Sequence, residues 1–381
     1  MENLINIPHL EEMDEIHKLE QKILNETNIP VCNVSHWNSG KEYKKLILSQ
    51  YRASTPLNYS DYQYSYAYSN DTKKTVISNL MCTNPNKYDC VFIHNATAAI
   101  CCIADYLKKH GYQKICVIEP AYFSIYSCLL SFGLNVHKEN AILNSKGEIE
   151  LPYDNILQKE YDVVWITSPI FSTGLYFTQS QIDCINSLVQ KGTLLIIDES
   201  AASPKNTLSS KLNYAKNIIS IFSPHKYLAI NAVKFAVIIC THSISTYIEN
   251  WIDVFAGALP LSTCIAIEHY LSSNFEHCLT LHDQYIKNNM KQIQELCNLF
   301  PDNYCTGKAT NYITICNQSL PYVKSLNELN IYEIMQYTYV SFVPGYINGF
   351  SSQWGFCYRV NLTLDANTIK STIGRLFNYF S

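Results

Sequence analysis

The chain has 381 residues, with 28 Lys and Arg against 32 Asp and Glu, so its formal net charge is −4. Hydrophobic residues make up 47% of it and charged residues 16%, which excludes a disordered chain and provides for a large core. A slightly acidic chain has no overall attraction for nucleic acid or an anionic membrane, and no apolar run approaches the ~18 residues of a membrane span. We therefore expect neither nucleic acid nor membrane as a partner.

The N-terminal sequence and the cysteines bear on the compartment. Residues 1–20 are acidic and amphipathic and lack the apolar core of a signal peptide. In such a long chain without a signal peptide, the 15 cysteines are expected to be reduced thiols, which indicates a cytoplasmic location. No Cys-x-x-Cys pair and no His/Cys cluster with zinc spacing occurs, so we expect no metal site.

Residues 1–50 look like an arm that precedes the main fold. The spacing of apolar residues predicts a helix over 13–24, and residues 25–30 break it. Residues 58–68 are rich in tyrosine and resemble no regular core element, whereas residues 71–81 read as a helix.

From about residue 90, short apolar, β-rich runs alternate with helical stretches. The predicted strands are residues 90–94, 114–119, 134–139, 162–167, 193–198, 218–223 and 234–240, with helices over 98–109, 121–132 and 178–191. The strands are continuously apolar rather than alternating, which is typical of a sheet covered on both faces. The pattern predicts a doubly wound, mostly parallel α/β sheet, in which ligands bind beyond the carboxyl ends of the strands.

After about residue 258 the pattern becomes that of a smaller α+β domain. Residues 261–300 read as one long helix or two abutting helices. The remaining predicted elements are strands over 311–317, 339–345 and 357–362 and helices near 325–337 and over 365–380. We expect the N-terminal arm to complete this domain. The predicted organisation is an arm over 1–50, a large domain over 51–260 and a small domain over 261–381.

Polar and aromatic residues follow several predicted strands. Asn95-Ala96-Thr97 opens a helix, where free N–H groups suit a phosphate, although Asn and Thr are also ordinary helix caps. Tyr122 would either stack on the flat ring of a ligand or pack in the core. Asp198 closes a buried strand and either caps the next segment or pairs with a protonated group. Lys226 follows another buried strand, where desolvation frees an amine for Schiff-base chemistry, although most loop lysines only face solvent.

Together these positions meet the needs of a phosphorylated aromatic cofactor. All of them lie at the carboxyl ends of one predicted sheet. The helix N-terminus would hold the phosphate, the aromatic would stack on the ring, the acid would hold a pyridinium nitrogen and the lysine would form an imine.

The segment Ser223-Pro-His-Lys226, with Lys234 eight positions after Lys226, resembles the Ser-x-x-Lys segment of the class I/II aminotransferases. These are pyridoxal-phosphate enzymes with the aspartate-aminotransferase fold, and the resemblance runs from about residue 30 to the C-terminus. It implies pyridoxal 5'-phosphate as cofactor, with Lys226 forming the internal aldimine and Ser223 and Lys234 binding the phosphate. The family usually has arginine where Lys234 stands, and lysine offers a point charge instead of a fork.

Other segments extend the resemblance. By their matches, Asp198 binds the pyridine nitrogen, Asn95, Ala96 and Thr97 form the phosphate-binding turn, and Tyr122 is the stacking ring. Arg359 matches the arginine that grips the substrate α-carboxylate, a task that lysine does poorly. Arg359 is one of only three arginines in a chain that otherwise uses lysine, which strengthens this match.

The resemblance also implies a homodimer with active sites at the interface, because a tyrosine of the partner chain touches the phosphate in this family. Tyr66 and Tyr68 are the nearest matches, the alternative being that this segment is surface packing. His36, Trp37 and Asn38 lie where the arm of the family approaches the substrate carboxylate, so we expect them to line the pocket.

Two departures concern the phenolic oxygen of the cofactor. The family has an Asn where this chain has Phe171 and a Tyr where it has Ala201, and both normally donate to that oxygen. Without them we expect a raised aldimine pKa, because the protonated imine must then stabilise the phenolate. The alternative is that another side chain, such as Ser200 or a tyrosine of 58–68, replaces the donors.

These residues and the resemblance are consistent with three functions. The first is an aminotransferase that acts on an amino acid, in which Lys226 moves the α-proton as general base and acid. The second is elimination, decarboxylation or cyclisation of an amino acid in specialised metabolism on the same scaffold. The third is a relative that binds cofactor or partner without turnover, against which the presence of Lys226, Asp198 and Arg359 argues.

Overall fold

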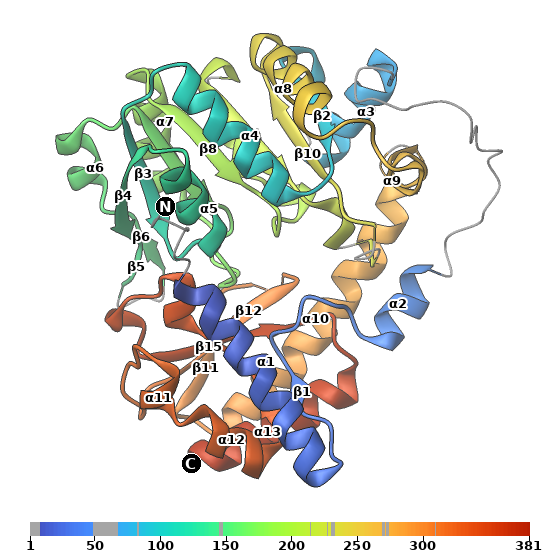
Figure 1. The fold of residues 1–381 in the computed structure, drawn as a ribbon, viewed down its shortest axis with the longest axis vertical. Coiled ribbons are helices and arrows are strands. Elements are labelled where there is room, and N and C mark those ends of the chain that lie inside the picture. The colour runs from blue at the N-terminus through green and yellow to red at the C-terminus, as the bar shows by residue number, and fades with distance from the viewer. Residues whose placement is uncertain are drawn as a thin grey trace, which may run out of the picture.

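The structure is a computed structural model that describes residues 8–48, 68–81, 84–144, 148–213, 215–226, 228–229, 233–268, 271, 274–308 and 310–381. Figure 1 shows two parts, each built around a β-sheet, with helix α1 (Pro8–Thr27) beside the C-terminal helices in the lower part. Within the described ranges, no helix combines the length and the apolarity that crossing a membrane requires.

The larger sheet, as far as the described residues go, has seven strands in the order β2-β10-β9-β8-β7-β3-β4. The strands are β2 (Asp89–Ile93), β3 (Lys114–Glu119), β4 (Asn135–Asn140), β7 (Val163–Thr167), β8 (Leu194–Asp198), β9 (Ile218–Phe222) and β10 (Ala236–Cys240). Strand β10 pairs antiparallel with β2 and β9, and the other neighbours pair parallel. The predicted mostly parallel sheet is confirmed.

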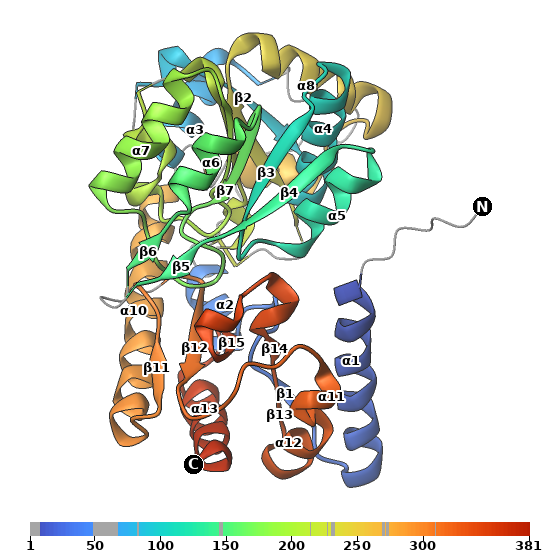
Figure 2. The ribbon, with the colours of Figure 1, turned by 90° about the vertical axis from the view of Figure 1, so that its left-hand side faces the viewer.

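Helices cover both faces of this sheet, as Figure 2 shows. Helices α4 (Ala96–Lys109), α5 (Phe123–Ser131) and α8 (His242–Phe255) lie on one face, and α3 (Asn70–Met81), α6 (Tyr153–Lys159) and α7 (Gln179–Gln190) on the other. In β7, Val163 and Trp165 pack with α4, α5 and α8, whereas Val164 and Ile166 pack with α6 and α7. Each central strand therefore buries both of its sides, which explains the continuous apolar runs.

The smaller sheet has the order β11-β12-β15-β14. Its elements are β11 (Asn303–Cys305), β12 (Tyr312–Asn317), β14 (Val343–Pro344) and β15 (Phe356–Asn361), with helices α10 (Phe275–Leu299), α12 (Ile331–Thr338) and α13 (Ala366–Phe380). Ile16 and Ile23 of α1 share its core with Ile373 and Leu376 of α13. The first part of the N-terminal arm thus packs onto the C-terminal part, as predicted, whereas Tyr43 and Ile47 near its end pack in the core beneath β2 and β10. The domain boundaries at residues 50 and 260 stay a prediction.

Helix α10 belongs to both cores. Phe275 and Leu279, near its start, pack in the core beneath β2 and β10, whereas Ile286 and Ile293 pack in the core of the smaller sheet. Among the described residues of the segment 261–300, the structure has two α-helices, α9 (Leu261–Ala266) and α10, with residues 267–274 between them, which is nearer to the second of the two predicted alternatives.

Two predicted elements are each divided in the structure. The strand over 339–345 becomes β13 (Val340–Ser341), which pairs with β1 (Cys32–Asn33), and β14, which pairs with β15. The helix near 325–337 becomes α11 (Leu326–Leu329) and α12, separated by Asn330 at φ +50. Asparagine tolerates this left-handed conformation, which a helix interior cannot contain.

Several elements were not predicted from the sequence. They are β1, α2 (Lys41–Leu48), α6, α8, β11, the hairpin of β5 (Ile142–Leu143) and β6 (Ile149–Glu150), and 3-10 turns at 85–87, 204–206, 209–211, 215–217, 224–226, 345–348 and 352–354. Helix α8 is rich in Ser, Thr and Ile near its start, and these residues have modest helix propensity.

The loop after β7 depends on a glycine. Gly174 has φ +67, and a Cβ there would lie 2.1 Å from the backbone oxygen of Lys308. We expect Gly174→Ala to lower the free energy of unfolding by about 3 kcal/mol, from left-handed strain plus the clash. Gly111→Ala is the matched control, because Gly111 has φ +74 and nothing within 4 Å of a Cβ. Urea denaturation should show a loss of only about 1 kcal/mol there; equal losses would contradict the role of the Lys308 contact.

Candidate active site

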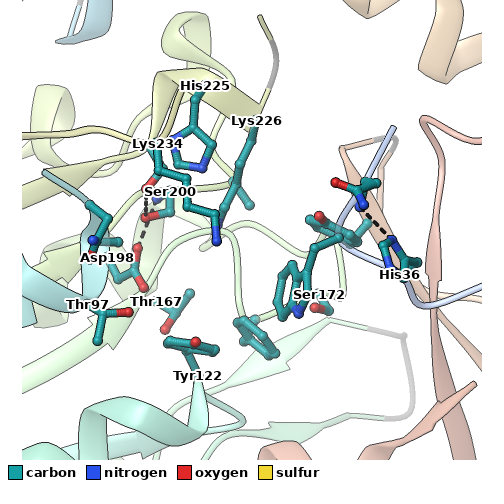
Figure 3. A pocket seen from close by; sticks show the side chains of 18 residues that line it. His36, Thr97, Tyr122, Thr167, Ser172, Asp198, Ser200, His225, Lys226 and Lys234 are labelled. Atoms are coloured by element: carbon teal, nitrogen blue, oxygen red, sulfur yellow. Dashed lines mark hydrogen bonds between the residues drawn. The ribbon is translucent and has the colours of Figure 1, made fainter. Parts of the chain in front are cut away.

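A cavity of about 370 Å³ lies at the carboxyl edge of the larger sheet. Figure 3 shows Asp198, Thr167 and Ser200 on one side of it and His36, from the N-terminal segment, on the other. Among the predicted site residues, those that line the cavity are His36, Trp37, Asn38, Asn95, Ala96, Thr97, Tyr122, Asp198, Ser223, Lys226 and Lys234. Tyr68 and Arg359, also predicted, are not among the lining residues.

The start of helix α4 offers backbone donors to the cavity. The side chain of Asn95 caps the helix by accepting from the N–H of Ala98 at 2.8 Å. The preceding N–H groups, of Ala96 and Thr97, have no partner within the helix, since its first turn lacks acceptors for them. Buried Ser223 and exposed Lys234 line the same cavity. Backbone N–H groups, a hydroxyl and an ammonium together form a seat suited to an anion.

Asp198 and Lys226 come from neighbouring strands. Asp198 ends β8, is 7% exposed and accepts from the N–H of Ser200 at 3.0 Å. Lys226 stands in the 3-10 turn after β9, and its carbonyl oxygen accepts from the Asn311 side chain at 2.9 Å. Burial lowers the pKa of Lys226, which the nearby Asp198 carboxylate partly opposes. The lowered pKa makes the amine a better nucleophile and base near neutral pH than an exposed lysine.

Aromatic rings form one wall of the cavity. Trp37 meets Tyr312 edge-on at 5.4 Å between ring centroids and Tyr122 at 6.1 Å. Phe171 lies 6.2 Å from Tyr122. These rings give the cavity flat, apolar surfaces suited to an aromatic ligand.

Arg359 lies behind Trp37. Its Cζ is 3.8 Å from the centroid of the Trp37 ring, and the Lys226 Nζ is 5.9 Å from the same centroid. One guanidinium nitrogen, Nη2, donates to the Ser35 carbonyl oxygen at 2.7 Å, and the buried Nε has no partner among the described residues. Burial lowers the pKa of Arg359 to about 10, so it remains charged at neutral pH.

No protein-family model matches the chain. A curated relative, histidinol-phosphate aminotransferase of Buchnera aphidicola subsp. Cinara cedri (strain Cc), is 24% identical over 198 residues, which are 49% of this chain and 55% of the relative. The chain thus matches about half the length of that relative.

Solved structures match nearly the whole chain. YbdL of Escherichia coli, described as having a methionine aminotransferase function, has a TM-score of 0.76 at 12% identity and covers 96% of each chain. N-succinyldiaminopimelate aminotransferase of Mycobacterium tuberculosis has a TM-score of 0.75 at 13% identity, with 96% of each chain covered. The chain has the class I/II aminotransferase fold. Cystalysin from Treponema denticola, whose structure contains pyridoxal 5'-phosphate, matches 97% of this chain and 95% of its own at a TM-score of 0.69 and 16% identity.

Within this aminotransferase fold, several contacts of the site escaped the sequence analysis. Ser35 accepts from Arg359 through its carbonyl oxygen, and the Asn361 side chain donates to the carbonyl oxygens of His36 and Asn38 at 2.8 and 3.0 Å. Asn311 holds the backbone of Lys226. Each contact joins residues far apart in the sequence, so no local spacing signals it.

Tyr68 packs its ring 4.8 Å from Phe92, in the core beneath β2 and β10. Its predicted contact with the cofactor of a partner chain stays a prediction. Tyr66 lies outside the described residues, as does most of the tyrosine-rich segment 58–68.

Glu199, next to Asp198, is a fully buried carboxyl group. It accepts from the backbone N–H groups of Leu208 and Ser209 and from the Ser209 hydroxyl. Burial raises the pKa of Glu199 to about 7, with the Asp198 carboxylate adding to the rise. The group is therefore partly protonated near neutral pH.

This pKa predicts a pH-dependent stability. Because the folded pKa of Glu199 exceeds its ordinary value of 4.5, its contribution is fully present below pH 4.5 and is lost as pH rises through about 7. The loss amounts to about 3 kcal/mol. Glu199→Gln fits the same partners without titrating, so urea unfolding of wild type and variant should diverge between pH 4.5 and 8. Parallel stability curves would contradict this prediction.

Proposed function

We propose that this chain is a pyridoxal-phosphate-dependent aminotransferase that acts on an amino acid. The proposal rests on one observation: Lys226, Asp198 and an anion seat at the start of α4 line the same cavity. The aminotransferase fold supports it, although a fold alone hosts several reactions.

The cavity fits the cofactor in polarity and shape. The N–H groups at the start of α4, the Ser223 hydroxyl and the Lys234 ammonium suit a phosphate. The hydroxyl oxygens of Thr167 and Ser172 are buried without a partner among the described residues, although both residues line the cavity. Native structures seldom leave buried polar atoms unpaired, so such hydroxyls fit a site that a polar ligand completes.

When bound, the cofactor supplies an aldehyde for an amino group and an electron-poor ring. Asp198 would hold a proton on the ring nitrogen, since its buried carboxylate favours a cationic partner. Tyr122 would lie against the ring. Lys226, with its lowered pKa, would take the proton from the substrate α-carbon and deliver it to the aldehyde carbon of the cofactor. Arg359 would bind the substrate carboxylate through its unpaired Nε–H once the Trp37 ring that covers the guanidinium turns aside.

The finer parts of the proposal concern assembly, location and domain limits. The family resemblance supports a homodimer with active sites at the interface. The cysteines among the described residues are free thiols, which supports the proposal of a cytoplasmic location. The proposed domain limits near residues 50 and 260 rest on the sequence pattern. The packing of α1 in the C-terminal core supports the joining of the N-terminal arm to the smaller part.

The test is the visible absorbance of the purified protein after addition of pyridoxal phosphate. Borohydride reduction and peptide mass mapping then locate the reduced adduct. A yellow protein with its adduct on Lys226 is the expected result. A colourless protein that takes up no cofactor would overturn the proposal.

A panel of amino acids then identifies the reaction. Formation of a 2-oxo acid, with the cofactor converted to its amine form, is the result expected for transamination. Release of ammonia or carbon dioxide with the cofactor retained would instead assign the chain to elimination or decarboxylation.

A further inference from the structure

Two buried hydroxyls of the cavity are not used by the proposed function. The Oγ1 of Thr167 and the Oγ of Ser172 have no hydrogen-bond partner in the part of the chain that the structure describes. Both residues line the cavity, and Thr167 as a whole is only 3% exposed. A buried hydroxyl without a partner in the wall of a cavity is a candidate donor to a ligand atom there.

The strand order shows which side of the ligand Thr167 faces. The residues suited to the phosphate follow β2 and β9 or precede β10, all on one side of β8 in the order β2-β10-β9-β8-β7. Asp198 ends β8, and Thr167 ends β7 on the opposite side. In pyridoxal phosphate, the ring carbon that bears the aldehyde lies opposite the ring nitrogen, between the ring carbon that carries the phosphorylated side chain and the ring carbon that carries the phenolic oxygen. With the phosphate toward β9 and β10, the phenolic oxygen therefore faces β7.

The register places the two side chains on one face of the sheet. Thr167 is paired with Asp198 across the parallel strands, so their side chains project in the same direction. The packing of the same strands agrees, since Val163 and Trp165 of β7 share a core with Leu194 and Ile196 of β8. The backbone of Thr167 thus lies about one strand spacing, ~4.8 Å, from that of Asp198, the residue expected to hold the ring nitrogen.

The other neighbours cannot serve as readily. Phe171 and Ala201, which stand where the family has its two donors, carry no polar group. The Ser200 hydroxyl is held 2.9 Å from the Ser223 hydroxyl, from which it accepts, and this contact places Ser200 on the phosphate side. Ser172 lies in a left-handed turn at φ +58, beyond the end of β7, and its unpaired hydroxyl is a second donor in the cavity wall.

We infer that the Thr167 hydroxyl binds the phenolic oxygen of the cofactor and replaces the two donors that this chain lacks. The inference rests on the proposed function. A hydroxyl donating to a phenolate stabilises the anion and so eases loss of the neighbouring imine proton. With Thr167 in this role, the chromophore titrates at a lower pH than it would without a donor.

The test is a pH titration of the visible absorbance of the cofactor-loaded protein. Thr167→Val keeps the shape and removes the hydroxyl, and we expect it to raise the pKa of the chromophore by about one unit or more. Thr167→Ser keeps the hydroxyl and should titrate like wild type. Ser168→Ala is the matched control, because the Ser168 hydroxyl is also buried and unpaired but does not line the cavity.

The outcomes separate the inference from the proposed function. A yellow Thr167→Val protein that titrates like wild type would overturn the inference alone. A wild-type protein that takes up no cofactor would overturn the proposed function and the inference together. Should Thr167→Val fail to fold, Thr167→Ala tests the same hydroxyl. Equal shifts in Thr167→Ser and Thr167→Ala would also overturn the inference, since they would report packing and not the hydroxyl.

Discussion

Lys226→Ala is expected to lower the rate of amino-acid turnover by at least about 10⁴-fold. The variant loses the amine that binds the cofactor and moves the substrate proton, and proton transfer alone contributes up to about 10⁴-fold. Lys226 lines the cavity, and burial lowers its pKa, so no other described group duplicates its position. The measurement is steady-state turnover on the amino acid found in the panel, together with the visible absorbance.

The control is Lys216→Ala, which removes an exposed lysine on the loop before β9. It should keep wild-type turnover and absorbance. If Lys226→Ala turned over at more than a hundredth of the wild-type rate, Lys226 would not be the group that moves the proton.

Asp198→Asn is expected to lower turnover by about a thousandfold. The substitution keeps the shape and can still accept from the Ser200 N–H, but removes the negative charge next to the ring. A charge pair at ~4 Å in a partly screened site is worth about 4 kcal/mol, which corresponds to about a thousandfold in rate. Steady-state kinetics on the cofactor-loaded variant measures this loss.

Asp154→Asn, at an exposed carboxylate of α6, controls for the loss of a charge as such. It should leave turnover unchanged. An Asp198→Asn variant with full turnover would show that the ring needs no carboxylate partner in this chain. A variant that binds no cofactor would place the role of Asp198 in binding.

The strand ends could be predicted because their signal is local. A buried apolar strand followed at once by Asp198 or Lys226 is visible in the sequence, and the parallel sheet brings such ends to one edge. The mostly parallel order could be predicted from the alternation of apolar strands and helices along the chain. The start of α4 was predicted for the same reason.

The rest of the site could not be predicted, since it depends on contacts between distant segments. Ser35 holds Arg359 across 324 residues of sequence, and Trp37 covers the guanidinium. Thr167 reads as the last residue of a strand, and its unpaired hydroxyl appears only once its neighbours are in place. Helix α8 was missed because Ser, Thr and Ile weaken its local pattern, and packing on the sheet stabilises it instead.

Helix α10 is 25 residues long, which makes it about 38 Å from end to end. Its first turns are packed in one core and its later turns in the other. If either core unfolded, about half of the helix would lose its packing contacts. That half would then tend to unfold, because an isolated helical segment is only marginally stable in water. The thermodynamic stabilities of the two cores are therefore interdependent, and a core substitution in either part is felt on both sides of the cavity between them.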